Sequence, residues 1–352
     1  MEKQHMRRPL SATLAVVLLA LGYSINAKAD EPVRVISDRT PSHLEPLFAL
    51  YTETTGVEIQ PVFVDEGLVA RLKSRPTEAD LVITKTADLL EAAKADALLQ
   101  PFESDVIVTG VAPELRDVDN TYVTLSYRPR SIFVSKERVQ PGAIATYDDL
   151  TDPRWRGRIC IRSGYHDYNL SLFSQMAADR GLDAARAFIK GLHENLARTP
   201  TGNDRAQVRA VYEGECDLSI GNSYYMPIML SRDDQRPWGE ATRVVFPDQA
   251  GDGAYVMRGG AALTTATDNL EAATGLLEYL VSEEAQAFIV NTTFEYSILD
   301  SVDMPAANRA LGAEQPEVQD GRFKAEFIPL DAIAAQRQAV VQILDEVDFD
   351  GK

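Results

Sequence analysis

Short apolar segments alternate with amphipathic segments along most of this chain, and this alternation constrains the fold more than any single motif. Val33–Ile36 and Asp80–Thr84 have the length and apolar content of buried strands, and a helical pattern follows each of them. The same order returns in the second half, around Arg158–Arg162 and Asp217–Ile220. Strands that alternate with helices are typical of parallel α/β sheets. We therefore expect an α/β fold.

The length of the chain predicts two lobes, because 352 residues exceed what one hydrophobic core usually covers. Two strand-rich stretches, 124–134 and 242–256, bracket the middle block and are candidate crossings between the lobes. We expect a hinge there and a ligand cleft between the lobes. The predicted division places in one lobe residues 30–128 and 248–300, and in the other residues 129–247 and 301–352.

The first 29 residues have the features of an export signal. Lys3, Arg7 and Arg8 form a basic start, residues 14–21 form an apolar core, and Ala27-Lys28-Ala29 is a small-x-small cleavage site. The apolar run is short for a membrane-spanning helix. We therefore expect cleavage after about Ala29 and a mature protein in the periplasm.

Charge and cysteine content agree with that compartment. The formal net charge is −18; four basic residues and one acidic residue lie in the leader, so the remainder carries −21. Such acidity argues against nucleic acid, which needs a basic footprint, and fits either a cation carrier or simple solubility. In an oxidising compartment, we expect the two cysteines, Cys160 and Cys216, to form a disulfide. We also expect a monomer.

Adjacent tyrosines, Tyr224 and Tyr225, are the strongest functional signal, and Tyr168 lies upstream. A phenolate oxygen is a hard anionic ligand that suits Fe(III), and a highly charged metal makes the phenolate the stable form. Neighbouring residues of a regular strand point to opposite faces, so the pair can serve one site only where strand 217–220 gives way to a turn or a helix. Tyrosines are also common half-buried core residues, and both interpretations stay open at this point.

Several passages carry a wider pattern in a fixed order: Leu125–Val134, Thr146–Ser163, Tyr168–Ser171, Gly214–Asp217 and Asn222–Tyr225. Over about Val33 to Ile298, the chain resembles the periplasmic ferric-iron-binding proteins of ABC importers, within the type II periplasmic substrate-binding proteins. It looks nearest to the branch that binds iron mainly through tyrosines. The resemblance implies a two-lobe fold that captures ferric iron by chelation and hinge closure and delivers it to an inner-membrane ABC permease.

The resemblance also implies a set of ligands. Tyr168, Tyr224 and Tyr225 fall on three tyrosines that ligate Fe(III) in the family. Arg130 falls on an arginine that faces the metal and, in some members, helps to hold an anion such as carbonate. A planar guanidinium pairs with carbonate through two hydrogen bonds.

The first strand departs from the family pattern, because Thr40 and Pro41 stand where His and Tyr are common. Asp38, His43 or Glu66 can compensate, although Asp38 also fits a helix cap. Three phenolates with an anion or water can complete the site from one lobe. Alternatively, the ligand is a chelated iron or a small organic solute such as a polyamine or phosphonate.

A secreted enzyme is the hypothesis from another class. The sequence contains no Gly-x-Ser-x-Gly, His-Glu-x-x-His or Cys-x-x-Cys motif. We therefore expect a binding protein without enzymatic activity.

Overall fold

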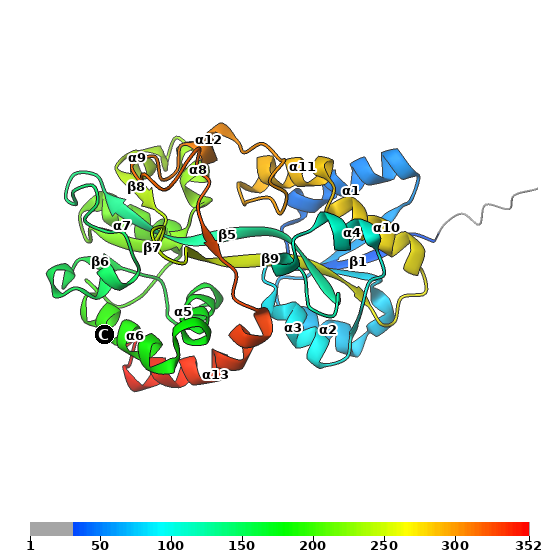
Figure 1. Cartoon of the computed structure of the whole chain (residues 1–352), viewed down its shortest axis with the longest axis horizontal. Helices are drawn as coiled ribbons and strands as arrows, with labels where there is room; N and C mark the ends of the chain where they lie inside the picture. Colours follow the sequence, from blue (N-terminus) through cyan, green and yellow to red (C-terminus); the bar gives the residue numbers. More distant parts are fainter. Residues whose placement is uncertain (1–30, 352) are drawn as a thin grey trace, which may run out of the picture.

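Two α/β lobes share one ten-stranded sheet (Figure 1). The structure, a computed structural model, describes residues 31–351, so the predicted signal peptide lies outside the described residues. Within that range, no helix has both the length and the apolar character needed to cross a membrane. The strand order is β2-β1-β3-β9-β5-β7-β6, with β4 and β10 paired to β9 and β8 paired to β5.

The first lobe is built on three parallel strands, β1 (Val33–Ser37), β2 (Ile59–Phe63) and β3 (Leu81–Thr84). Every residue of β3 is buried, as expected for a strand that helices cover on both faces. The remaining elements of this lobe are α1 (Pro41–Thr55), α2 (Leu68–Ser74), α3 (Asp88–Ala95), β4 (Leu99–Gln100), α4 (Asp105–Gly110), α10 (Leu270–Leu280) and α11 (Glu283–Thr293).

The second lobe contains β6 (Ile159–Cys160), β7 (Leu218–Asn222) and β8 (Thr242–Val245). Its helices are α5 (Asp167–Arg180), α6 (Leu182–Glu194), α7 (Asp204–Glu213), α8 (Tyr225–Leu230) and α9 (Arg236–Glu240). The chain ends with α12 (Ala306–Arg309), β10 (Ala325–Glu326) and the long helix α13 (Leu330–Glu346), which packs on α5 and α6.

Two long strands, β5 (Tyr122–Ser135) and β9 (Ala254–Thr264), run between the lobes (Figure 1). They pair antiparallel from Tyr122 to Pro129, after which β5 pairs with β7. The first crossing was predicted correctly at 124–134. The second prediction, 242–256, was displaced: this stretch holds β8, then a turn, and only the start of β9.

The turn before β9 explains that displacement. Asp248 has φ +59°, Gly253 has φ +109°, and both values fall in the left-handed region. A Cβ on Gly253 would lie 2.4 Å from the carbonyl oxygen of Lys324, so only glycine fits there. The Pro247–Gly253 segment therefore forms a turn and not a strand.

Candidate metal-binding site

A disulfide between Cys160 and Cys216 fastens the base of the site, as predicted. The two cysteines lie on β6 and just before β7, which are parallel neighbours with Cys160 opposite Ser219. Because parallel strands leave the sheet at the same edge, the segments that follow them end close together. One segment leads to Tyr168 and the other to Tyr224.

The tyrosine pair lies where a strand becomes a helix, again as predicted. β7 ends at Asn222, Tyr224 is the N-cap of α8 and Tyr225 is its first residue. Tyr224 has φ −61° and ψ −18°, so the pair has left the strand conformation that would separate the two side chains. Their ring centroids lie 4.3 Å apart.

Tyr168 lies in the first turn of α5, as its second residue. The cap is His166, whose Nδ1 accepts the backbone N–H of Tyr168 at 3.1 Å. Burial, with the Arg162 charge adding to it, lowers the pKa of His166 to about 4, so the imidazole is neutral and able to accept. The guanidinium groups of Arg128, Arg130 and Arg162 lie 5.7, 5.7 and 5.2 Å from the centre of the Tyr168 ring.

The structure brings Tyr168 and Tyr224 together on the wall of a cavity of about 400 Å³ between the lobes. Its other walls come from the first lobe, from α8 and from the crossing strand: Asp38, Arg39, Thr40, Pro41, His43, Phe63, Val64, Asp65, Lys85, Arg128, Ile228, Thr292, Thr293 and Glu295. A second cavity, of about 580 Å³, shares Asp38, Asp65, Lys85 and Tyr168 with the first. The two form one cleft lined by both lobes.

Burial and mutual proximity govern the charge state of the tyrosines. Burial raises the pKa of Tyr224, and the neighbouring Tyr168 and Tyr225 raise it further. Burial likewise raises the pKa of Tyr225 to about 12, with Tyr168 contributing. The three phenols therefore interact electrostatically, and Tyr224 and Tyr225 keep their protons at neutral pH unless a cation binds.

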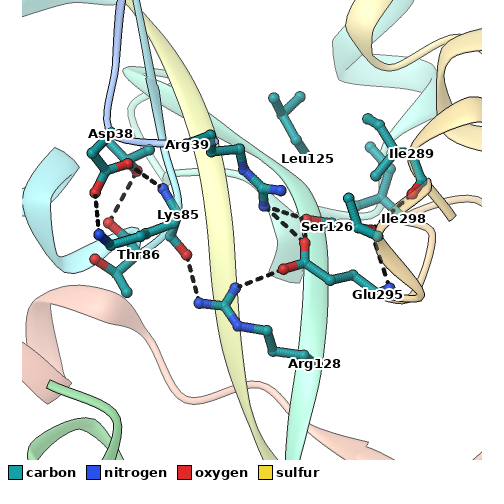
Figure 2. A network of polar contacts seen from close by, with 12 residues as sticks. Asp38, Arg39, Lys85, Thr86, Leu125, Ser126, Arg128, Ile289, Glu295 and Ile298 are labelled. Atoms are coloured by element: carbon teal, nitrogen blue, oxygen red, sulfur yellow. Dashed lines mark hydrogen bonds and ion pairs between the residues drawn. The ribbon is translucent and has the colours of Figure 1, made fainter. Parts of the chain in front are cut away.

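The opposite wall is a network centred on Glu295 (Figure 2). Arg39 Nη2 donates to Glu295 Oε2 at 2.8 Å, the Ser126 hydroxyl donates to the same oxygen, and Arg128 Nη1 lies 3.5 Å from Oε1. Burial alone would raise the pKa of Glu295, but Arg39 and Arg128 outweigh it and hold the pKa at about 2. Glu295 is therefore a carboxylate over the whole physiological range.

This wall carries a net positive charge and unused donors. Two guanidinium groups share the single carboxylate of Glu295, and both are almost fully buried. Arg128 also donates from Nη2 to the Lys85 carbonyl at 2.7 Å. Within residues 31–351, Arg39 Nε and Arg128 Nε and Nη1 are buried without a hydrogen bond. Buried donors of this kind need an acceptor, so the wall suits an anion.

Arg130 occupies a different place from Arg128. It is fully buried, Nη1 donates to Asp204 at 2.8 Å and to Asn222 at 3.0 Å, and Nη2 donates to Asn169 at 2.7 Å. It lines neither cavity of the cleft. Arg130 thus holds residues beside the tyrosines, while Arg128 faces the cavity. Sequence reasoning missed Arg128, although an Arg-x-Arg pair in a buried strand places both side chains on one face.

The altered first strand supplies polar atoms but no cluster of metal ligands. Thr40, Pro41 and His43 line the first cavity, whereas Glu66 lines only the second. Asp38 is not the helix cap, because Thr40 holds that position; Asp38 Oδ1 instead accepts the backbone N–H of Lys85 at 2.7 Å. In the described part of the chain, no group of three His, Cys, Asp or Glu residues could hold a metal ion. The tyrosines are therefore the main candidate ligands.

Comparison with known proteins agrees with this geometry. The chain is 33% identical over 345 residues to iron uptake protein A1 of Synechocystis sp., covering 95% of this chain and 93% of that relative. A Bordetella ferric binding protein superposes with a TM-score of 0.83 at 32% identity, covering 91% of this chain and 100% of that chain. A Trichodesmium protein (IdiA, FutA) in complex with iron and citrate ligands gives 0.83 at 29% identity, over 91% and 100%.

These likenesses confirm the predicted two-lobe type II periplasmic binding fold. The family described as bacterial extracellular solute-binding protein matches residues 77–319, well over half of the sequence. With both the family match and a relative above 30% identity along almost the whole length, the chain belongs to the bacterial extracellular solute-binding protein family.

Proposed function

We propose that this protein captures ferric iron in the periplasm and delivers it to an inner-membrane ABC permease. The observation that carries the proposal is that Tyr168 and Tyr224 line one cleft between the lobes, in a family whose relatives are named for ferric iron. Tyr225 lies behind them, with its ring 4.3 Å from that of Tyr224 and outside the lining of both cavities. Tyr168, Tyr224 and Tyr225 are the proposed ligands. Their oxygens are hard donors, and three phenolates balance the charge of one Fe(III). No covalent chemistry is involved.

All three ligands come from the second lobe, so the remaining coordination positions face the cationic wall. The cavity lining holds three cations, Arg39, Lys85 and Arg128, and three carboxylates, Asp38, Asp65 and Glu295. Even so, buried donors of Arg39 and Arg128 have no acceptor. This supports a bound anion, such as carbonate, that bridges the metal and the Arg128 guanidinium. Arg130, predicted as the anion partner, would act by fixing Asn169 and Asn222 beside the tyrosines.

A chelated iron is the second candidate, and the size of the cleft favours it. Its cavities of about 400 and 580 Å³ exceed what one ion and a carbonate fill. A relative has been solved with iron and citrate. A polyamine is a poor match, since the unused donors of Arg39 and Arg128 call for negative charge.

The proposal also covers the compartment of the protein and the conditions that favour release of iron. The basic and apolar leader, the disulfide and the family all support a periplasmic protein, which we expect to be a monomer. Acid would favour release because protons compete with the metal for phenolate oxygen. Reduction would favour it as well, because Fe(II) is a poorer match for hard anionic ligands.

A visible absorption titration tests the proposal. Chelator-stripped protein is titrated with ferric nitrilotriacetate, alone, with bicarbonate and with citrate. We expect a tyrosinate-to-iron charge-transfer band that Tyr224→Phe and Tyr225→Phe abolish or shift. Tyr212→Phe is the control, because Tyr212 is exposed on α7 and lines neither cavity. Absence of a band under all three conditions would refute ferric binding through tyrosine.

A further inference from the structure

Arg337 joins the two lobes beside the cleft. It lies on α13, which packs along α5 and α6 of the second lobe and reaches α3 of the first (Figure 1). Arg337 Nη1 lies 3.4 Å from Asp88 Oδ2, and Arg337 Nη2 lies 2.5 Å from Asp167 Oδ1. Asp88 is the first residue of α3 and Asp167 is the first residue of α5. One guanidinium therefore holds a carboxylate from each lobe.

The position of this link relates it to the metal-binding site. Asp167 immediately precedes Tyr168, and both line the second cavity. The lining of that cavity also includes Thr86, two residues before Asp88, and Leu89, the residue after it. Because α13 packs on α5, opening the cleft would stretch the contact of Arg337 with Asp88 and spare its contact with Asp167.

The Arg337 side chain decides whether Asp88 and Asp167 are held together or repel each other. Asp88 and Asp167 both contact one guanidinium, so their carboxylates are close neighbours of like charge. With Arg337 present, each carboxylate is attracted to the shared cation. With Arg337 neutralised, the two carboxylates repel each other, and the repulsion favours separation of α3 from α5.

We propose that Arg337 is a positioning residue for metal capture, which holds α3 of the first lobe against the helix that carries Tyr168 and so slows release from the closed cleft. The inference rests on the proposed function for its effect on iron, although its effect on lobe angle does not require iron. The side chains of Arg337, Asp88 and Asp167 are 37%, 23% and 60% exposed. Partly exposed ion pairs contribute little free energy, so we expect the rate of release to change roughly 1.5- to five-fold.

The experiment compares Arg337→Gln, Asp88→Asn and their double variant with a matched control. Arg186→Gln serves as that control, because Arg186 on α6 pairs with Glu346 on α13 and both belong to the second lobe. Release from the iron-loaded protein to excess competing chelator is followed by the charge-transfer band. Small-angle X-ray scattering of the metal-free protein measures lobe opening, and thermal unfolding measures stability.

We expect Arg337→Gln and Asp88→Asn to speed release and to increase the radius of gyration, with no further increase in the double variant. Arg186→Gln should leave both quantities at the wild-type values. Wild-type release and scattering in Arg337→Gln would overturn the inference. Equal effects from Arg186→Gln would also overturn it, because anchoring of α13 would then be the cause. If the wild-type protein shows no band, the proposed function fails, and the scattering comparison still decides the role of Arg337.

Discussion

Cys160 and Cys216 each precede a tyrosine of the site by the same number of residues. Tyr168 follows Cys160 by eight positions, and Tyr224 follows Cys216 by eight. The disulfide brings the Cα atoms of the two cysteines to 5.8 Å. Equal lengths of chain then run from this bond to two of the proposed ligands. The disulfide and the parallel pairing of β6 and β7 thus hold together the starting points of the two segments that lead to Tyr168 and Tyr224.

Removing the disulfide should destabilise the metal-free protein. The bond closes a loop with a sequence separation of 56 residues, for which chain entropy gives roughly 4 kcal/mol. We expect the Cys160→Ser/Cys216→Ser variant to lose about that much free energy of unfolding in a denaturant titration. Wild-type protein treated with a reductant should behave like the variant. An unchanged midpoint in both samples would contradict the structural role of the bond.

Iron binding should release protons. The pKa of Tyr224 is raised and that of Tyr225 is about 12, so both hydroxyls are protonated at neutral pH in the metal-free protein. Loading in weakly buffered solution should therefore liberate at least these two protons per iron, and the apparent affinity should fall as the pH is lowered. A pH-stat titration measures the release. Tyr225→Phe should release one proton fewer, whereas Tyr212→Phe should match the wild type.

Changing Arg128 or Arg130 to glutamine should affect different properties: mainly the bicarbonate effect for Arg128, and mainly stability for Arg130. Arg130→Gln removes one partner of a fully buried ion pair with Asp204 and also removes the donors to Asn169 and Asn222. Arg162 stays 3.2 Å from Asp204, so we expect a cost of about 3 kcal/mol, the lower end of the usual range for breaking a buried pair. Arg128→Gln leaves Glu295 paired with Arg39, so we expect a smaller loss of stability and a loss of the bicarbonate effect on the charge-transfer band. Thermal unfolding and a bicarbonate titration separate the two. Retention of the full bicarbonate effect in Arg128→Gln would reject its contact with the anion.

Glu295 should make the metal-free protein sensitive to acid. Its pKa in the folded state, about 2, lies below its usual value of 4.5. The ionised form therefore stabilises the fold above pH ~4.5, and this contribution, about 3 kcal/mol, is lost as the pH falls toward 2. The difference in unfolding free energy between wild type and Glu295→Gln should shrink over that interval. A difference that stays constant from pH 5 to 2 would contradict the shifted pKa.

The fold could be predicted from the sequence more fully than the residues that line the cavity. Local alternation sufficed for the α/β fold, and the strand-to-helix change before Tyr224 followed from the geometry of neighbouring side chains. Arg39 and Glu295 are 256 positions apart, and no local pattern indicates that they meet. The choice between Arg128 and Arg130 depends on β5 exchanging β9 for β7 as its partner after Pro129, which is a tertiary event. Arg337 was missed for the same reason.

The crossing strand β5 has a mechanical consequence. Both of its edges are hydrogen-bonded to neighbouring strands, so it can twist but cannot slide. Arg128 lies in the middle of this strand, paired with Met257 of β9 and two residues before the pairing with β7 begins at Arg130. A change in the angle between the lobes must therefore rotate this guanidinium relative to the tyrosines. The crossing strand is thus both the hinge and a wall of the cavity. The angle between the lobes and the arrangement of groups that face a bound ligand therefore change together.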